Sequence, residues 1–381
     1  MQLYKAAYCA ENSVYIWEQT SWPSLTWDEG SLAAPLAAAR HEQGKLLGKM
    51  EAVGFDLREE AMLQTLTQDV VKTSEIEGEN LDTQQVRSSI ARRLGIDIGA
   101  LPPVDRNVEG IVDVMLDATG KYQEPVTADR LFAWHGALFP TGRSGLSKIS
   151  VGDWRDDASG PMQVISGAYG RERIHFSAPP AYRVPGEMAG FLDWLNAPSE
   201  TDPVIKAAVA HFWFVTIHPF EDGNGRIARA IADLALARSE GTPHRYYSMS
   251  AQIQKERKAY YDLLEKTQKG DLNITPWILW FLASLRHAIQ EAETTVANVL
   301  AKARFWDRAA QFALNERQIK MLNRLLDGFE GKLTSSKWAK IADCSQDTAG
   351  RDIAALVDLG LLRRGEGGGR NTHYEICLAG S

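Results

Sequence analysis

The chain has 381 residues and a mass of 42.2 kDa, with 44% hydrophobic and 24% charged residues, as in ordinary globular proteins. This composition excludes a disordered chain, a collagen-like fibre and a disulfide-bonded mini-protein, and the length predicts two or three domains. The net charge of −7 gives no basic excess of the kind that nucleic-acid-binding proteins carry. The three cysteines Cys9, Cys344 and Cys377 form no CxxC pair, so we expect free thiols in a reducing cytosol.

No segment predicts a membrane span or a signal peptide. The N-terminus lacks an apolar h-region. The longest strongly apolar run, Trp277 to Leu285, is too short for a bilayer core of about 30 Å. We therefore expect a cytoplasmic protein without a membrane partner.

Helical periodicity dominates the first part of the chain, residues 1–103. The opening contains Trp17, Trp22 and Trp27, which predict an irregular or strand-containing cap packed by aromatic rings. Apolar residues at helical spacing predict helices over 32–50, 58–76 and 84–94. Gly78 follows the second helix, at the position of a C-cap glycine.

Residues 104–286 read as a second, mainly helical domain with one β-hairpin. Glycines, prolines and short apolar runs between 140 and 186 predict the hairpin. Helices are expected over 107–117, 128–138, 184–195, 204–217, 226–239, 255–268 and 276–286.

The remaining residues predict a helical linker over 287–311 and a terminal module over 312–381. In the module, helices over 318–326, 335–343 and 346–359 precede a glycine-rich turn at 365–369 and a strand over 372–377. Three helices followed by such a turn are typical of a winged helix.

The charges of this module argue against strong DNA binding. Residues 315–381 contain ten Lys/Arg and nine Asp/Glu, and the proposed recognition helix carries Asp347, Asp352 and Asp358. Arg363, Arg364 and Arg370 near the turn leave weak DNA contact open. Protein docking or homodimerisation is favoured.

One segment, residues 218–229 (HPFEDGNGRIAR), concentrates groups that bind phosphate. Gly223, Asn224 and Gly225 can turn consecutive backbone N–H groups toward an anion, at the positive end of the helix that follows. Arg226 and Arg229 are three residues apart and share a face of that helix, and arginine pairs bidentately with phosphate.

The same segment carries an acid–base group and a metal ligand. Asp222 is a hard carboxylate suited to Mg²⁺ shared with phosphates. His218 has a side chain whose ordinary pKa, about 6.5, suits proton transfer near neutral pH. The chemistry predicts transfer of a phosphate-containing group from a nucleotide to a nucleophile activated by His218.

The segment also matches G-x-G-x-x-A, the dinucleotide-binding fingerprint. That fingerprint requires a preceding strand and a second strand that ends in an acid about 20 residues on. Here the pattern stays helical up to Gly241, so a Rossmann fold is disfavoured.

The segment resembles the signature of the Fic family, H-x-F-x-[D/E]-G-N-G-R-x-x-R, at every fixed position. The resemblance implies a helical Fic fold and transfer of AMP from ATP to a protein hydroxyl, with His218 as base and Asp222 on Mg²⁺. It implies that Gly223, Asn224 and Gly225 hold the phosphates. Arg226 would bind the transferred and leaving phosphates, and Arg229 the γ-phosphate.

A second resemblance implies auto-inhibition. Residues 73–78 match the family's inhibitory motif, [S/T]-x-x-x-E-[G/N], at Thr73, Glu77 and Gly78. In the class with this motif upstream of the core, its glutamate pairs with the second arginine, here Glu77 with Arg229. The pair would deprive the γ-phosphate of its arginine.

Further positions are implied with alternatives open. Phe176 to Pro180 resemble the exit of the family's flap hairpin, which implies that Ile174, His175 and Phe176 help to clamp the target, although hairpin packing also explains His175. Tyr260 and Tyr261 either flank adenine or pack against Trp277 and Trp280. His135, His211 and His287 read as core or surface residues rather than metal ligands.

Two classes of function follow. The first is an auto-inhibited adenylyltransferase that modifies a hydroxyl side chain of a target protein and of itself, with removal of AMP as a variant. The second is a DNA-binding regulator in which the Fic core senses a nucleotide.

Overall fold

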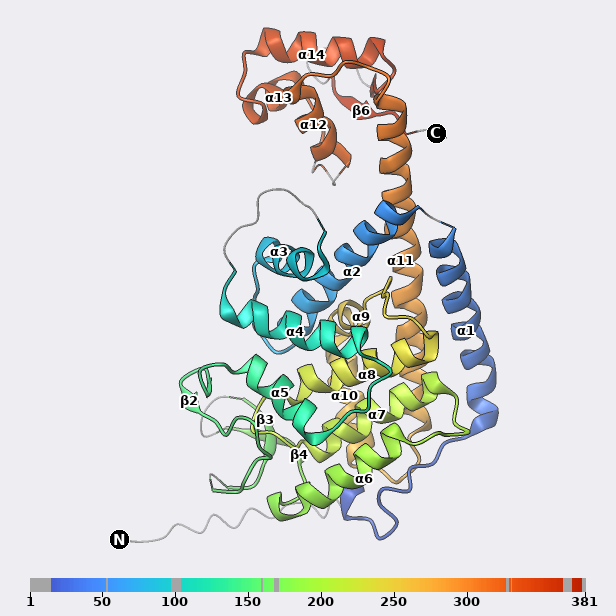
Figure 1. The fold of residues 1–381 in the computed structure, drawn as a ribbon, viewed down its shortest axis with the longest axis vertical. Helices are drawn as coiled ribbons and strands as arrows, with labels where there is room; N and C mark the ends of the chain where they lie inside the picture. The colour runs from blue at the N-terminus through green and yellow to red at the C-terminus, as the bar shows by residue number, and fades with distance from the viewer. Residues whose placement is uncertain are drawn as a thin grey trace. The chain divides into compact units, whose positions relative to one another are not determined.

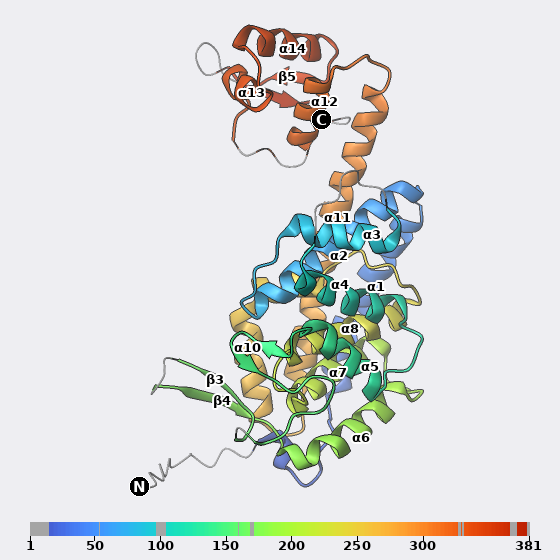
Figure 2. The same cartoon turned by 60° about the vertical axis from the view of Figure 1, so that its left-hand side comes forward.

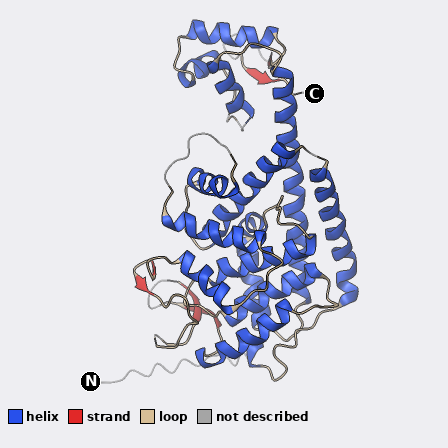
Figure 3. Cartoon of the chain, in the orientation of Figure 1, coloured by secondary structure: helices blue, strands red, loops and turns tan. Residues whose placement is uncertain are grey.

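A computed structural model describes residues 15–52, 54–96, 104–158, 160–167, 171–326, 329, 331–365 and 372–378. These residues are mainly helical, and their short strands pair into two-stranded antiparallel sheets (Figure 3). The mainly α fold class is confirmed. Within the described ranges, no helix has both the length and the apolarity that crossing a membrane requires. Cys9, the Pro102–Pro103 loop, the turn glycines 367–369 and Arg370 lie outside the described residues.

The chain divides into two compact units, Met1–Glu293 (unit 1) and Thr294–Ser381 (unit 2). The boundary falls inside one continuous helix, α11 (Thr275–Ala309), where the sequence suggested a helix to 286 and a separate linker. Phe305 and Ala309, near the end of α11, belong to the hydrophobic core of unit 2. Unit 2 therefore begins before Phe312, the residue expected to open the terminal module.

The start of the described chain is an irregular cap, as expected. After the 3-10 turn η1 (Ile16–Glu18), Trp17 donates its indole N–H to the carbonyl of Ser177 at 2.7 Å. Trp22 packs edge to face against Trp213, with ring centres 6.2 Å apart. The aromatic rings thus attach the cap to residues far along unit 1.

The N-terminal helices of unit 1 agree with the predicted ones to within a few residues. They are α1 (Glu29–Glu51), α2 (Phe55–Ile76), α3 (Thr83–Leu94), α4 (Arg106–Gly120) and α5 (Ala128–Leu138). Helix α2 packs against α3, α4, α8 and α9, so its C-terminal end reaches the centre of the unit.

The core of unit 1 is built on α7 (Pro203–Ile217) and α8 (Asn224–Glu240), which pack along one another (Figure 1). From Val204 to Ile217 nearly every residue of α7 is buried, because its alanines, valines and aromatic residues leave it no polar face. The loop between these helices carries the segment 218–223, so the motif lies at the middle of the packed core.

The other elements of unit 1 surround this pair. They are β1 (Arg143–Ser144), β2 (Ser147–Lys148), β3 (Gln163–Ser166), β4 (Arg173–Ser177), η2 (Ala181–Arg183), α6 (Val184–Asn196), α9 (Met249–Lys255) and α10 (Arg257–Gln268). The hairpin β3–β4 projects beside α10 (Figure 2).

The helix predicted over 255–268 is present as α10, which begins two residues later, and a short helix that the sequence did not predict, α9, precedes it. The chain forms α9 and then breaks at Glu256 (φ −100°, ψ 20°) before α10. The Glu256 carboxylate accepts hydrogen bonds from Trp280 at 3.0 Å and Ser284 at 3.2 Å, both on α11. Contacts with a distant helix therefore override the local helical pattern.

Unit 2 has the three predicted helices and the predicted strand near 372–377, together with a further strand, β5, that the sequence did not predict. These are α12 (Glu316–Leu326), α13 (Ser335–Ile341), α14 (Gln346–Asp358), β5 (Leu362–Arg364) and β6 (Tyr374–Ile376). Asp352, on the proposed recognition helix, is buried and accepts hydrogen bonds from Arg317 at 2.9 Å and Asn315 at 3.0 Å. The negative charge of Asp352 is therefore paired with Arg317 inside unit 2.

Two histidines of the unit 1 core, His135 and His211, are fully buried. His211 lies 2.9 Å from the hydroxyl of Tyr260, and His135 stacks on Phe220 with ring centres 4.2 Å apart. Burial lowers the pKa of His135 to about 4 and the pKa of His211 to about 3. Both imidazoles are therefore neutral in the folded protein at pH 5 to 7.

We predict that stability falls as the pH drops below about 6.5, the ordinary pKa of histidine. In that range the unfolded chain binds protons on these histidines and the folded chain does not, so each contributes a slope of up to about 1.4 kcal/mol per pH unit. Urea unfolding at pH 7 and pH 5 measures the slope. His211→Gln, which keeps a hydrogen-bonding group near Tyr260, should reduce the slope. An unchanged slope would show that His211 does not contribute to the pH dependence of stability.

Candidate active site

A cavity of about 910 Å³ opens between the N-terminus of α8, helix α10 and the hairpin β3–β4. Its lining includes His218, Asp222, Gly223, Asn224, Gly225 and Glu77, together with Tyr260, Tyr261, His175 and Phe176. The structure therefore brings the signature, the end of the predicted inhibitory helix and the flap to one cavity. Ile174, Thr73, Arg226 and Arg229 lie outside its lining, and the two arginines are buried behind it.

His218 ends α7 in the left-handed backbone region, with φ 53° and ψ 59°. Its Nδ1 lies 3.1 Å from the carbonyl of Val215. A carbonyl only accepts, so Nδ1 carries the hydrogen and Nε2 is left as the basic nitrogen. Burial, assisted by the charge of Arg155, lowers the pKa of His218 below its ordinary value. The neutral form, which can take up a proton, is therefore the form present near pH 7.

Arg155, which the sequence did not single out, holds the backbone of His218. Its Nε donates to the His218 carbonyl at 2.7 Å, its Nη2 donates to the Pro179 carbonyl at 2.5 Å, and its N–H donates to the Pro219 carbonyl at 2.9 Å. The side chain is buried. Arg155 thus stabilises the unusual backbone of His218 and ties it to the exit of the flap.

The loop before α8 forms an anion cradle, which we define as residues 223–225. Gly223 has φ 79°, and a Cβ there would lie 2.9 Å from the Phe139 ring, so the position needs glycine. Asn224 uses its side-chain amide to close the loop on the backbone of Phe220, at 2.7 and 2.9 Å. What the cradle offers an anion is therefore the free backbone N–H groups of the first turn of α8.

Asp222 lies beside the cradle. Its carboxylate accepts hydrogen bonds from the hydroxyl of Ser144 on β1 and from the N–H of Gly223. The described residues contain no cluster of three or more His, Cys, Asp or Glu side chains arranged to hold a metal ion. One carboxylate next to a phosphate-binding loop fits Mg²⁺, which takes most of its ligands from phosphates and water.

Arg229 is 2% exposed, and the C-terminal turn of α2 supplies partners for its guanidinium. Its Nη2 donates to Glu77 at 2.7 Å and to the Thr73 carbonyl at 2.9 Å, and its Nε donates to the Thr73 hydroxyl at 2.6 Å. Burial opposes the charge, but Glu77 and the nearby tyrosines raise the pKa of Arg229 above its ordinary value. The ion pair predicted from the motif is present.

A second ion pair, which the sequence reasoning missed, joins Arg226 to Glu79 at 2.8 Å. The end of α2 explains both pairs. Gly78, with φ 87°, donates to the Glu75 carbonyl, and Glu79 N–H donates to the Ser74 carbonyl, both at 3.0 Å. These are the two hydrogen bonds of a Schellman motif. The turn aims Glu77 and Glu79 (the acidic pair) at Arg229 and Arg226 (the arginine pair).

The Glu77 carboxylate lies against the anion cradle. A Cβ on Gly225 would come within 2.1 Å of Glu77 Oε1 and 3.2 Å of Arg229 Nη1. Only glycine leaves room for an oxygen this close to the backbone. The carboxylate therefore fills the space directly beside the backbone of the cradle.

Tyr260 and Tyr261 lie on α10 at the opposite wall of the cavity. The Tyr260 ring is buried and packs on Trp277 and Trp280, with centres 6.0 and 5.4 Å away, as the packing alternative predicts. Tyr261 lies under the guanidinium of Arg257, whose Nε also donates to the Ile76 carbonyl at the end of α2.

The flap residues differ in exposure. Phe176 is buried and packs edge to face on Tyr15, with ring centres 5.3 Å apart, so it anchors the hairpin. Ile165 and Ile174 form an exposed cross-strand pair. His175 lies between Ser166 and Glu265.

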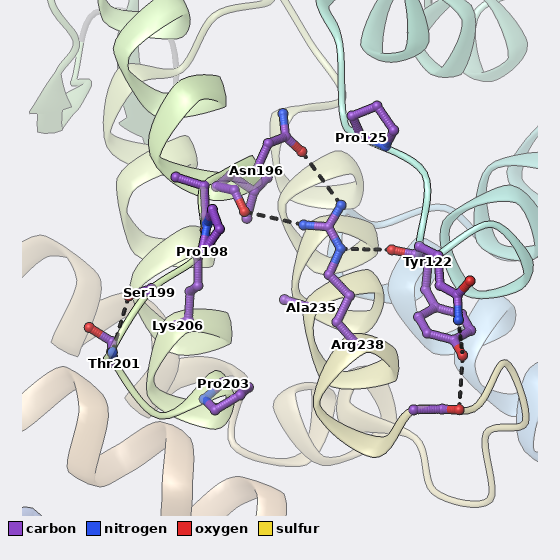
Figure 4. Close-up of a pocket in the computed structure, with 14 residues that line it drawn as sticks. Tyr122, Pro125, Asn196, Pro198, Ser199, Thr201, Pro203, Lys206, Ala235 and Arg238 are labelled. Carbon is purple, nitrogen blue, oxygen red and sulfur yellow. Dashed lines mark hydrogen bonds between the residues drawn. The ribbon is translucent and has the colours of Figure 1, made fainter.

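A second cavity, of about 720 Å³, lies near the C-terminal end of α8 (Figure 4). Its cations are already engaged by backbone carbonyls. Arg238 donates to those of Tyr122 and Glu124 at 2.7 and 2.9 Å, and Lys206 to that of Ala197 at 2.7 Å. These contacts join loops and helix ends, and this cavity has none of the signature groups.

Comparisons with known proteins agree with this geometry. Residues 125–236 match the model of the Fic/DOC family, and residues 15–96 match a domain of unknown function, DUF4172. A protein adenylyltransferase, fic-1, from Caenorhabditis briggsae is 35% identical over 120 residues, which are 30% of this chain and 22% of that protein. A protein adenylyltransferase Fic from Culex quinquefasciatus is 28% identical over 208 residues, 52% of this chain and 36% of that protein. The chain thus matches well under half the length of these relatives.

Among solved structures, a Fic family protein from Desulfovibrio desulfuricans G20 has the same fold, with a TM-score of 0.51 and 22% identity. The match covers 90% of this chain and 96% of that one. The signature at the start of α8, the domain match and the shared fold lead to one conclusion: residues 125–236 of this chain form a domain similar to those of the Fic/DOC family.

Proposed function

We propose that this protein is an auto-inhibited adenylyltransferase that transfers AMP from Mg-ATP to a hydroxyl side chain of a target protein and of itself. The observation that carries the proposal is the carboxylate of Glu77, held by Arg229 against the anion cradle, in the cavity that contains His218. An anion already lies where a phosphate would lie, next to a neutral imidazole.

In this mechanism Nε2 of His218 takes the proton of the acceptor hydroxyl, whose oxygen attacks the α-phosphorus of ATP. The bond from the α-phosphorus to the bridging oxygen breaks, and pyrophosphate leaves. The free N–H groups of the cradle and the arginine pair stabilise the charge of the phosphates. Arg155 keeps His218 in position throughout.

Mg²⁺, held by Asp222 and the phosphates, would neutralise charge on the leaving group. Ser144 orients the carboxylate from the side of the β1–β2 hairpin.

The acidic pair accounts for the resting state. Glu77 competes with the γ-phosphate for Arg229, and Glu79 competes with the phosphates for Arg226. ATP therefore binds poorly, or in a pose that misplaces its α-phosphate, until the end of α2 moves away. Release requires the Schellman turn at Gly78 to shift, because this turn positions both carboxylates.

We predict that Glu77→Gly raises self-modification by at least about tenfold. A charge-assisted hydrogen bond contributes about 1.5 to 3 kcal/mol, and each 1.4 kcal/mol is about tenfold in affinity. The measurement is the intact mass after incubation with Mg-ATP. Glu75→Gly is the matched control, because Glu75 lies on the same helix end but pairs with Lys72. Adding His218→Ala to Glu77→Gly should abolish the AMP adduct. Equal incorporation by parent and Glu77→Gly proteins would refute the inhibitory role.

Glu79→Ala should raise self-modification about two- to fivefold and add to the effect of Glu77→Gly. The smaller effect follows from exposure: the Glu79 side chain is 48% exposed, and such ion pairs contribute about 1 kcal/mol or less. The initial rate of AMP incorporation measures it, with Glu75→Ala as the charge-matched control. If Glu79→Ala and the parent incorporate AMP at the same rate, Glu79 does not contribute to inhibition and Glu77 acts alone.

Asp222→Asn should lower transfer in the Glu77→Gly background by about 10² or more, since a metal stabilises transition-state charge by several kcal/mol. Asparagine keeps the size and the hydrogen-bond acceptor and removes the charge. Titration of Mg²⁺ and of a chelator into both proteins is the measurement. Transfer that survives the chelator in the Glu77→Gly protein would remove the metal from the mechanism.

A further inference from the structure

The end of α2 is attached to α10 by a contact that the mechanism above does not use. The hydrogen bonds of the Schellman motif at Gly78 satisfy two other carbonyls of this turn. The carbonyl of Ile76 instead accepts a hydrogen bond at 2.8 Å from Nε of Arg257, the first residue of α10. The turn that carries Glu77 is thus tied to a second helix that lines the same cavity.

The carbonyl of Ile76 needs this partner. Ile76 is fully buried, and a buried carbonyl without a hydrogen bond is costly. The last carbonyls of a helix also form its negative end, where an arginine side chain is favoured. Loss of the Arg257 guanidinium should therefore destabilise the present conformation of the turn.

Arg257 is oriented by contacts that do not involve α2. The break at Glu256 sets the start of α10, and the Glu256 carboxylate is held to α11 by Trp280 and Ser284. The Arg257 guanidinium lies over the ring of Tyr261, one turn further along α10, with Cζ 5.1 Å from the ring centre. The donor is therefore supported from its own helix.

We propose that Arg257 is a positioning residue of the inhibited state, an inference that rests on the auto-inhibition proposed above. By holding the Ile76 carbonyl, Arg257 keeps the turn in the conformation that places the acidic pair at the arginine pair. Arg257 acts here on the backbone, whereas Arg229 binds the Glu77 carboxylate itself. Weakening the contact with Ile76 should release the acidic pair and leave His218 and the anion cradle unchanged.

The first test changes Arg257 in the full chain. Arg257→Met keeps an unbranched side chain but donates no hydrogen bond. It should raise AMP incorporation by about three- to tenfold, the scale of one charge-assisted hydrogen bond from an exposed side chain. Arg257→Lys, which can still donate to the carbonyl, should stay within about twofold of the parent. A lysine variant as active as the methionine variant would contradict the hydrogen bond as the cause.

Lys258→Met is the matched control, because this neighbouring cation pairs with Asp262 on its own helix. It should leave the rate of AMP incorporation at the parent value.

The second test repeats Arg257→Met in a protein without the acidic pair, which carries Glu77→Gly and Glu79→Ala. Because the turn then has no carboxylate to position, the rate should change by less than about twofold. This comparison separates positioning from a direct effect on the nucleotide, since Arg257 also lines the cavity. The same change in both backgrounds, or no rise in the parent, would overturn the proposal.

Two measurements that need no transfer keep this inference separate from the adenylyltransferase proposal. The first is calorimetric titration with Mg²⁺ and an ATP analogue that has a methylene bridge between its α- and β-phosphates. Arg257→Met should bind the analogue about three- to tenfold more tightly than the parent. The second is hydrogen exchange of residues 73–79, which should be faster in Arg257→Met.

The combined results distinguish the two proposals. Tighter binding and faster exchange without AMP incorporation, even with Glu77→Gly, would support the positioning role and refute the transferase. Incorporation by the Glu77→Gly protein, with binding, exchange and rate unchanged by Arg257→Met, would refute the positioning role alone.

Discussion

The buried guanidinium of Arg229 is the constraint on which the rest of the site depends. A charge this deeply buried must have partners, because removing one partner of a buried pair costs about 3 to 5 kcal/mol. In the structure, Thr73 and Glu77 supply them. In the proposed active state the γ-phosphate would replace Glu77 as the anion beside Arg229. On this proposal, the inhibited and the active states differ in which anion neutralises the buried guanidinium of Arg229.

The end of α2 determines where the carboxylate partner of Arg229 lies. One glycine in the left-handed conformation closes a Schellman turn, and that turn places carboxylates on both sides of it against the two arginines of α8. Arg257 also holds the last carbonyls of α2 through its bond to Ile76. Because the same turn ends the helix and places Glu77 against the anion cradle, the proposed release of the cradle would require this helix end to loosen.

The catalytic side is built mainly from backbone. His218 has a left-handed φ, Gly223 has another, and α8 begins directly afterwards, so its first N–H groups face the cavity. Buried Arg155 fastens this loop to the flap exit at Pro179. The flap therefore shares a rigid support with His218, the proposed base, and on its cavity side it carries Ser166 and His175, which is hydrogen bonded to Glu265 of α10.

The sequence by itself predicted most of the helices and contains the complete signature, and its resemblance to the Fic family implied the Glu77–Arg229 pair. The signature can be read from the sequence because the groups of residues 218–229 lie within one loop and the turn of helix that follows, where spacing alone sets their relation. Only the tertiary structure decided which distant groups meet: Glu79 with Arg226, Arg155 with His218, and Ser166, His175 and Glu265 in one row. It also set the break at Glu256 between α9 and α10 and included the end of α11 in the core of unit 2. These contacts join segments far apart in the chain, so they depend on how helices pack, which local periodicity and spacing do not encode.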